Sequence, residues 1–169
     1  MIKFNFLIPI IFFVTLSSCR KENSNDTKLI EKTSIKVPLT VDSFPDSLVL
    51  NKFDAGCIIS YSKKGANEND NILMQGAEVP AQMGRSLFIM RIDGTWQLFH
   101  SNDERDVKTV NKNLIKAKLT NKNYNVEIIT HVGQYFSASD STEHFGTIKI
   151  TRKKDYSKIS VEFVGGIVC

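Results

Sequence analysis

Apolar and polar residues alternate with a period of two along most of the chain after Leu48, as in strands that bury one face. The clearest example is a pair of β-prone runs, residues 86–92 and 95–100, with Asp93-Gly94 between them. Asp-Gly in that position predicts a two-residue hairpin, because a type I′ turn needs positive φ at both central residues. This turn sets the cross-strand pairs Ile92 with Thr95, Arg91 with Trp96, Ile89 with Leu98, and Phe88 with Phe99.

The predicted hairpin carries apolar residues on both of its faces, unlike a strand pair with one side in water. We therefore expect it to be central and covered, or to lie where a sheet curls over itself. The position of Arg91 opposite Trp96 also predicts a cation–π contact. These two residues form one candidate binding surface.

Alternation also predicts strands in the segments 54–62, 71–75, 114–120, 124–132, 145–151 and 158–163. Residues 105–112 fit both a helical and a strand spacing, so that segment stays open. Gly165-Gly166 in the last run predicts a β-bulge that redirects the residues after it. Many short strands without a long helix predict an all-β fold: a small antiparallel sandwich or barrel with room for one short helix.

The first residues have the pattern of an export signal, because one basic residue, Lys3, precedes an apolar run over residues 4–16. Leu16-Ser17-Ser18-Cys19 then resembles the lipobox of bacterial lipoproteins, in which the cysteine becomes the acylated first residue of the mature protein. Plain secretion and a membrane span are the alternatives. A spanning helix needs about 20 apolar residues, and this run is shorter and contains Asn5 and Pro9.

These features predict a signal peptide over residues 1–18, a lipidated N-terminus and flexible tether over 19–43, and a single β domain over 44–169. We expect the protein in the bacterial cell envelope, held to the membrane through lipidated Cys19, with the membrane and its face left open. Removal of Lys3 with the signal leaves 21 basic against 18 acidic residues. This small, dispersed excess does not favour nucleic acid as a partner.

The chain contains three cysteines, and lipid on Cys19 leaves Cys57 and Cys169 as an even pair. A compartment outside the cytoplasmic membrane permits disulfides, so compartment and parity together predict a bridge between these two residues. Two buried free thiols are the alternative. A catalytic role for Cys57 is not favoured, because the apolar Ile58 and Ile59 follow it and no adjacent basic group lowers the pKa of its thiol.

No motif in the sequence indicates catalysis, a metal or a cofactor. His100, His131 and His144 occur without HxH or HxxxH spacing, and no CxxC pair is present. The carboxylates at 103, 104 and 106 are typical of a solvated loop. A hydrolase or metal-dependent enzyme that assembles the three histidines from distant loops is the alternative, because catalytic groups converge in space and not in sequence.

Two further segments are candidates for binding. Tyr135 and Phe136 precede a serine-rich run, and aromatic residues in a loop often mark a binding surface. The alternative for them is a strand end that folds back onto the core. Arg152-Lys153-Lys154 lies in a predicted turn and is a candidate contact for anionic lipid or glycan, although lysine-rich turns are often only solvated.

The order of several motifs resembles that of a group of small bacterial secreted or lipid-anchored proteins with cysteines at both ends of the domain. The motifs are Gly56-Cys57, residues 90–96, residues 124–129, residues 146–150 and a glycine-bearing last strand that ends in cysteine. The resemblance covers residues 50–169, implies a secreted β domain without an activity, and supports the Cys57–Cys169 bridge. This chain has one cysteine at each end, so any second bridge is missing.

Function has to be argued from a site, because one fold serves many functions. An anchor, a tether and a disulfide-closed β domain without a catalytic motif favour a non-catalytic lipoprotein over an enzyme. We therefore predict a binding or inhibitor module for a protein or glycan partner. Its expected binding surface consists of Arg91, Trp96, Tyr135 and Phe136.

Overall fold

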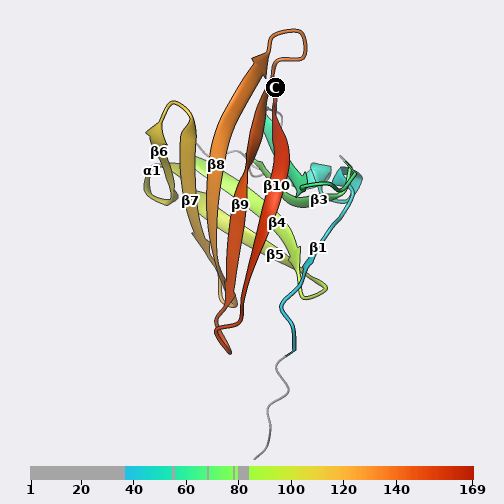
Figure 1. Ribbon diagram of the computed structural model, residues 1–169, viewed down its shortest axis with the longest axis vertical. Coiled ribbons are helices and arrows are strands. Elements are labelled where there is room, and N and C mark those ends of the chain that lie inside the picture. The colour runs from blue at the N-terminus through green and yellow to red at the C-terminus, as the bar shows by residue number, and fades with distance from the viewer. Residues whose placement is uncertain (1–36, 55, 68, 78, 80–83) are drawn as a thin grey trace, which may run out of the picture. The chain divides into compact units, whose positions relative to one another are not determined.

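The structure is a computed structural model that describes residues 37–169, apart from positions 55, 68, 78 and 80–83 (Figure 1). These residues belong to one compact unit that begins at Lys36. The predicted signal peptide, the predicted lipid site at Cys19 and most of the predicted tether lie outside the described residues.

Ten strands and three short helical segments make up the described fold. In chain order they are β1 (Val41–Asp42), the 3-10 helices η1 (Asp46–Leu48) and η2 (Leu50–Lys52), β2 (Ile58–Lys63), β3 (Asn71–Gly76), β4 (Arg85–Ile92), β5 (Thr95–Asn102), α1 (Asp103–Asp106), β6 (Val107–Asn111), β7 (Leu114–Thr120), β8 (Tyr124–Phe136), β9 (Ser141–Arg152) and β10 (Lys158–Val168). The all-β prediction is therefore confirmed, with one short α-helix.

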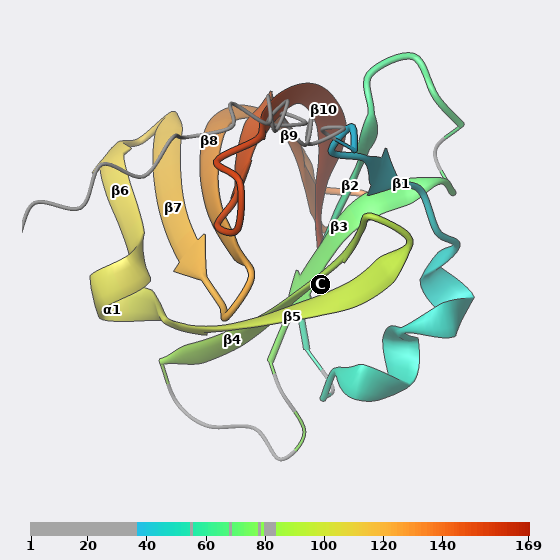
Figure 2. The same ribbon diagram turned by 90° about the horizontal axis from the view of Figure 1, so that it is seen from below.

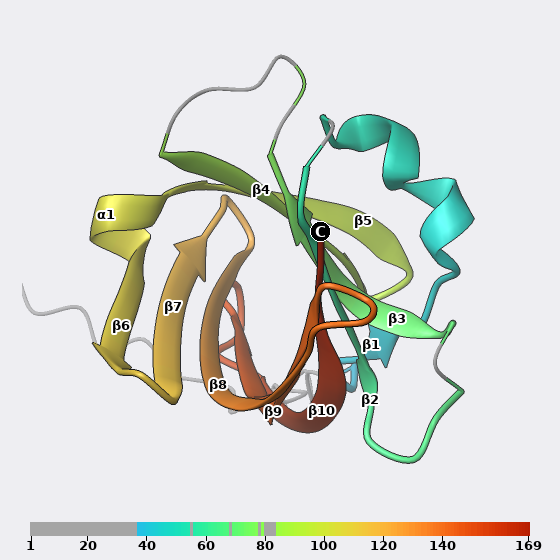
Figure 3. The same ribbon diagram turned by 90° about the horizontal axis from the view of Figure 1, so that it is seen from above.

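All ten strands form one antiparallel sheet in the order β1-β4-β3-β2-β10-β9-β8-β7-β6, with β5 also paired to β4. The sheet curls, so that the β4–β5 hairpin passes across the half that contains β7–β10 (Figures 2 and 3). Within the described residues the sheet is not closed into a barrel. The β7–β8 turn contacts β5 through a side chain and not through strand pairing. Asn121 Nδ2 donates to Gln97 Oε1 at 3.1 Å and to the Leu98 carbonyl at 3.4 Å.

The β4–β5 hairpin has the predicted register, with Ile92 opposite Thr95 and Arg91 opposite Trp96. Asp93 and Gly94 both have positive φ, as the predicted type I′ turn requires. The hairpin carries apolar residues on both faces because its strand β4 lies between two cores and is buried on both sides. The side chains of Phe88 and Met90 join the larger core, whereas those of Leu87 and Ile89 join a smaller one.

The larger core fills the inside of the curl. It receives every second residue of the long strands, as in β8, where Tyr124, Val126 and Ile128 are buried and the residues between them are exposed. The smaller core lies on the outer face of β3 and β4, where it is covered by Phe44, Val49 and Phe53, which lie before, between and after η1 and η2. One stretch of the outer face is therefore covered by chain preceding β2, and the outer face of β8–β10 is not.

The Gly165-Gly166 bulge prediction is wrong. Both residues pair in unbroken register with β2 and β9, whereas the register shifts in β2 after Tyr61 and in β8 after Val132. The glycines serve a close approach of strands: a Cβ on Gly165 would contact the Ser60 carbonyl oxygen, and one on Gly166 would contact that of Thr142. The open segment 105–112 contains the end of α1, β6 and the start of the β6–β7 turn.

Packed structure reaches further toward the N-terminus than the domain start predicted at residue 44. Leu39 and Val41 are buried in the larger core, and β1 pairs with the end of β4. The polar composition of the predicted tether concealed this, because two apolar side chains are enough to join a core that the rest of the chain has already formed. The chain therefore joins the sheet beside the β4–β5 turn.

Candidate functional site

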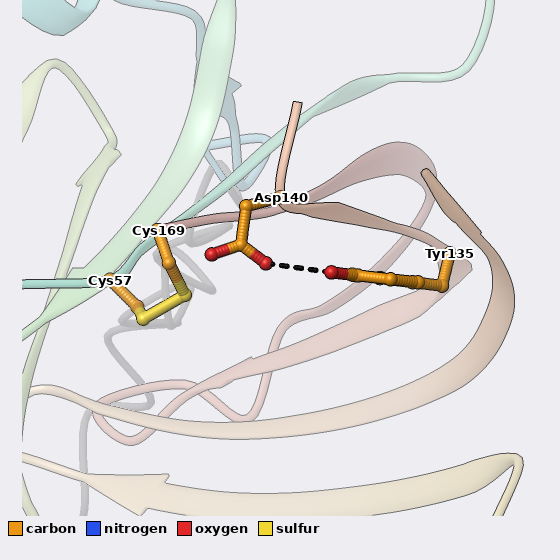
Figure 4. Close-up of a disulfide and its surroundings, with 4 residues drawn as sticks. All are labelled: Cys57, Tyr135, Asp140 and Cys169. Carbon is orange, nitrogen blue, oxygen red and sulfur yellow. Dashed lines mark hydrogen bonds between the residues drawn. A yellow bond between two sulfur atoms is a disulfide. The ribbon is translucent and has the colours of Figure 1, made fainter. Parts of the chain in front are cut away.

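Cys57 and Cys169 form a disulfide, as predicted. Cys57 immediately precedes β2 and Cys169 follows β10, and the two strands pair up to Ile58 opposite Val168. The Cys169 N–H also donates to the Asp140 carbonyl at 3.3 Å, which ties the β8–β9 turn to the same place (Figure 4). We call this region, with the bridge and the turn at residues 137–140, the disulfide end.

Tyr135 is held at the disulfide end by a local hydrogen bond. Its hydroxyl donates to Asp140 Oδ1 at 3.0 Å, and this bond raises the pKa of the tyrosine (Figure 4). Asp140 itself has a φ of 43°, in the left-handed region that aspartate tolerates in turns. Tyr135 and Phe136 both remain exposed, so these aromatic residues are available on the surface and do not fold back onto the core.

The two aromatic side chains point to opposite faces of the sheet, because successive residues of a strand do so. Tyr135 pairs with Thr142 and Phe136 with Ser141. Phe136 alone of the two lines a hollow of about 540 Å³ on the outer face of β2, β9 and β10. We call this hollow the outer groove.

The outer groove has both apolar and polar side chains in its lining, around a floor of backbone at Gly165 and Gly166. Phe136, Val164 and Val168 are its exposed large apolar residues, and Val168 exposes 56% of its surface. Gly166 lies between the two valines, opposite Ser60 on β2 and Glu143 on β9. A Cβ at that position would be too close to the carbonyl oxygen of Thr142, so the close approach of β9 requires glycine there and this part of the floor carries no side chain.

The other half of the same face is polar. Toward the opposite ends of β8, β9 and β10, a second hollow is lined mainly by polar residues, among them Asn125, Glu127, Lys149 and Ser160. Lys118 Nζ lies 3.8 Å from Glu127 Oε1 on the neighbouring strands. Apolar exposure on this face is therefore concentrated at the disulfide end, and it is not a general property of the three strands.

The three histidines lie in different environments. His144 is buried, and its Nδ1 lies 3.1 Å from the Tyr61 hydroxyl, which is in turn 3.3 Å from Thr130 Oγ1. Burial lowers the pKa of His144 and raises that of Tyr61 to about 12. His131 stacks on Phe145 at 5.4 Å on the opposite face.

No three metal-ligating side chains come together among the described residues. His100 is exposed on β5, His131 lies on the outer face of β8, and His144 is inside the curl. The structure therefore does not assemble the histidines that the alternative enzyme hypothesis would use.

Arg91 and Trp96 contact each other as predicted, with the guanidinium carbon 6.0 Å from the ring centroid. The indole also makes an edge contact with Phe44 at 5.0 Å, so it covers part of the smaller core. This pair lies beside the β4–β5 turn, far along the sheet from the β8–β9 turn (Figure 1). The fold does not bring the two predicted binding pairs together.

A buried polar cluster at the β4–β5 turn was not predicted from the sequence. Arg152 Nη1 donates to Asp93 Oδ2 at 2.8 Å, and Arg152 Nη2 donates to Asp155 Oδ2 at 2.8 Å and to the Val37 carbonyl at 2.6 Å. The Tyr124 hydroxyl donates to the same Asp93 oxygen at 2.8 Å. We call these residues the basal network, and the turns that meet there (93–94, 121–123 and 153–157) the basal end.

The basal network shifts the titration of its members. Arg152 holds the pKa of Asp155 far below its usual range by hydrogen bonding. Partial burial opposes a similar shift at Asp93, but hydrogen bonds from Thr40 N–H, Arg152 and Tyr124 lower its pKa overall. Burial and the bond to Asp93 raise the pKa of Tyr124 to about 12. An arginine in a lysine-rich turn gave no sign of this role, because its partner at residue 93 is 59 positions away.

Comparisons with protein-family models, with curated proteins and with solved structures each find no match to this chain. The resemblance to secreted and lipid-anchored β-proteins and to the lipobox therefore stays a prediction. Among the described residues, no helix has the length and apolar character needed to cross a membrane. The site has to be interpreted from its own geometry.

Proposed function

We propose that this protein is a lipid-anchored, non-catalytic binding module that holds a protein partner in the outer groove. The single observation that carries this proposal is that three exposed large apolar residues, Phe136, Val164 and Val168, line one hollow with a backbone floor. Contiguous apolar surface on a small soluble domain commonly marks an interaction site. The other half of the same face is polar, so the exposed apolar residues are confined to the disulfide end.

The lining of the groove favours a protein over a glycan as the partner. Its exposed large side chains are two valines and one aromatic ring, whereas sugars are typically held by several aromatic faces. Among the described residues of the lining, Glu143 is the only charged one. We infer that the partner inserts apolar side chains between Val164 and Val168 and places a basic group near Glu143.

The anchor part of the proposal is supported by the sequence Leu16-Ser17-Ser18-Cys19. Acylation of Cys19 would keep the groove at a membrane surface and raise its encounter rate with partners there. Metabolic labelling with palmitate tests it: the native chain should carry label and the Cys19→Ser variant should not. Equal labelling of both chains would contradict the anchor.

Site-specific photo-crosslinking in intact cells tests the groove. A photoreactive residue at position 168, in the groove, should form one saturable protein adduct, whereas the same residue at Ser160, in the polar half of β10, should not. The captured protein is then purified and titrated against the chain. A Val164→Asp change should weaken binding by roughly 30-fold, the effect of a central interface residue, and a matched Ser160→Asp change should leave it unchanged.

Three results would overturn a protein partner in the groove. Adducts of equal yield at positions 160 and 168 would show that the groove is not selective. Equal affinity of the Val164→Asp and Ser160→Asp variants would place binding elsewhere. Competition by envelope polysaccharide, without any protein adduct, would favour a glycan.

A further inference from the structure

The basal end brings two lysine-bearing turns together. The Lys153 N–H donates to the Asn123 carbonyl at 2.8 Å, and Lys153 Nζ bonds Thr120 Oγ1 at 2.8 Å and the Asn121 carbonyl. These bonds join the β7–β8 turn to the β9–β10 turn, and both turns lie at the bottom of Figure 1. The first described residues of the chain lie at this same end, because Arg152 bonds the Val37 carbonyl.

The charges exposed at the basal end are mainly positive. Lys122, Lys153 and Lys154 line a hollow of about 430 Å³ together with Asn123, Tyr124 and Arg152. The nearby carboxylates of Asp93 and Asp155 are engaged by Arg152, and that of Asp42 accepts the Gly94 N–H at 2.8 Å. Lys122 and Lys154 are exposed at the tips of the two turns.

An exposed aromatic side chain lies in the same turn as Lys153 and Lys154. Tyr156 exposes 78% of its surface, more than any other large apolar or aromatic residue described, and its φ is 56°. A non-glycine residue in that region is strained unless its surroundings hold it there, and such residues often serve a function. Here Asp155 and Ser157 on either side both bond Arg152, so the basal network holds Tyr156 outward.

Lysines around an outward tyrosine are the combination found at membrane–water interfaces, where the ring lies at headgroup level and the ammonium groups contact phosphates. We propose that the basal end docks on an anionic phospholipid surface, that of the membrane in which the chain is anchored. This inference rests on the proposed anchor at Cys19. Residues 20–36 separate Cys19 from Val37, so the basal end stays within about 60 Å of the anchor.

Docking at the basal end also agrees with the proposed function. The outer groove opens near the disulfide end, at the other end of β9 and β10 from the turn at 153–157 (Figure 1). A domain that stands on its basal turns therefore presents the groove away from the lipid. Nucleic acid is not favoured as the occupant, because the net positive charge of the whole chain is mild and its basic residues are dispersed along the sequence.

Hydrogen–deuterium exchange of the full chain, reconstituted in vesicles, tests this proposal. One set of vesicles contains phosphatidylcholine alone and the other contains phosphatidylcholine mixed with phosphatidylglycerol. Peptides that cover residues 121–125 and 153–158 should be protected only in the anionic vesicles, and added salt should remove the protection. Intact mass measured on the same sample reports whether Cys19 carries lipid.

Matched charge reversals separate the basal turns from lysines elsewhere. Lys122→Glu with Lys154→Glu should lower the ratio of docked to undocked chain by roughly 30-fold or more, since each lysine near such a surface contributes about a fivefold effect. Lys108→Glu with Lys112→Glu, on β6 and the β6–β7 turn, should leave protection unchanged. Tyr156→Gly keeps a residue that accepts positive φ and should reduce protection more modestly.

The outcomes distinguish the two proposals. A lipidated chain whose turns are equally exposed in neutral and anionic vesicles, or whose protection is unaffected by the Lys122 and Lys154 reversals, would overturn docking and leave the anchor standing. An equal loss with the Lys108 and Lys112 reversals would show only general charge attraction and would also overturn it. A chain without acyl mass would overturn the anchor, and this proposal with it.

Discussion

The basal end and the disulfide end of the sheet are held together by different means. At the basal end, buried Arg152 connects two turns and the incoming chain through charged hydrogen bonds. At the disulfide end, one covalent bond joins the start of β2 to the end of β10. The basal network holds the carboxylates of Asp93 and Asp155 in hydrogen bonds, whereas the bridge leaves the neighbouring side chains Phe136 and Val168 exposed. A covalently closed end can therefore present an apolar surface at little structural cost.

Loss of the bridge should have the largest effect on stability. Cys57→Ser with Cys169→Ser releases a loop of 112 residues, which the chain-entropy model values at about 4–5 kcal/mol. Urea unfolding of the variant should show a loss of this order. The native chain measured in reductant should give the same loss. A change below about 1 kcal/mol would show that pairing of β2 with β10 closes this end without covalent help.

Removal of the basal arginine should have the next largest effect. Arg152→Met leaves Asp93 and Asp155 without their partner, so the melting temperature should fall clearly, while Lys154→Met in the same turn should have little effect. Both carboxyl pKa values are lowered in the folded chain, so their stabilisation is fully present above about pH 3.8 and is lost as pH falls through the folded values. The difference between native and variant chains should therefore shrink in acid; a constant difference would contradict the charge-based account.

Protonation of His144, which lies inside the curl, should lower the stability of the folded chain by a smaller amount. Burial lowers its pKa below 6.5, so the unfolded chain takes up the proton first and stability falls as pH drops through 6.5, levelling off below the folded pKa. His144→Asn should remove this part of the pH dependence in thermal unfolding. His131→Asn, on the outer face, should leave it in place. An unchanged profile in His144→Asn would assign the dependence to other groups.

Changes in the outer groove should have the smallest effect on stability. Val168 exposes 56% of its surface, so Val168→Ser should change the free energy of unfolding by no more than about 0.5 kcal/mol. Leu87→Ser, in the smaller core, provides the contrast and should cost several times more. A large loss for Val168→Ser would mean that the groove contributes to packing and is not a surface kept for a partner.

Local signals in the sequence predicted the strands well. Asp93-Gly94 set the register of β4 with β5, because a two-residue turn permits only one pairing. The period-two pattern located the long strands, since each has one face inside the curl. The Cys57–Cys169 bridge followed from compartment and parity, which need no knowledge of the fold.

The candidate site was predicted only in part. Phe136 was predicted because aromatic residues near a turn stand out in a sequence. That it lies on the opposite face of the sheet from Tyr135 depends on both residues belonging to β8. Val164 and Val168 read as ordinary strand residues, and only the uncovered outer face makes them exposed. Gly165-Gly166 led to a wrong prediction, because glycine in a strand occurs both at bulges and where another backbone approaches closely, and the sequence alone does not distinguish the two.

The sequence by itself determined the strands, the Asp93-Gly94 turn and the cysteine pair. The strands and the turn depend on residues that are adjacent in the chain, and the pair depends on the number of cysteines. Only the tertiary structure decided which strand faces are covered, where Arg152 finds its partners, and which apolar residues remain at the surface. Those features depend on the curl of one sheet, which brings β4 across β7–β10 and places η1–η2 over one part of the outer face. Such contacts join residues far apart in the chain, and no local pattern records them.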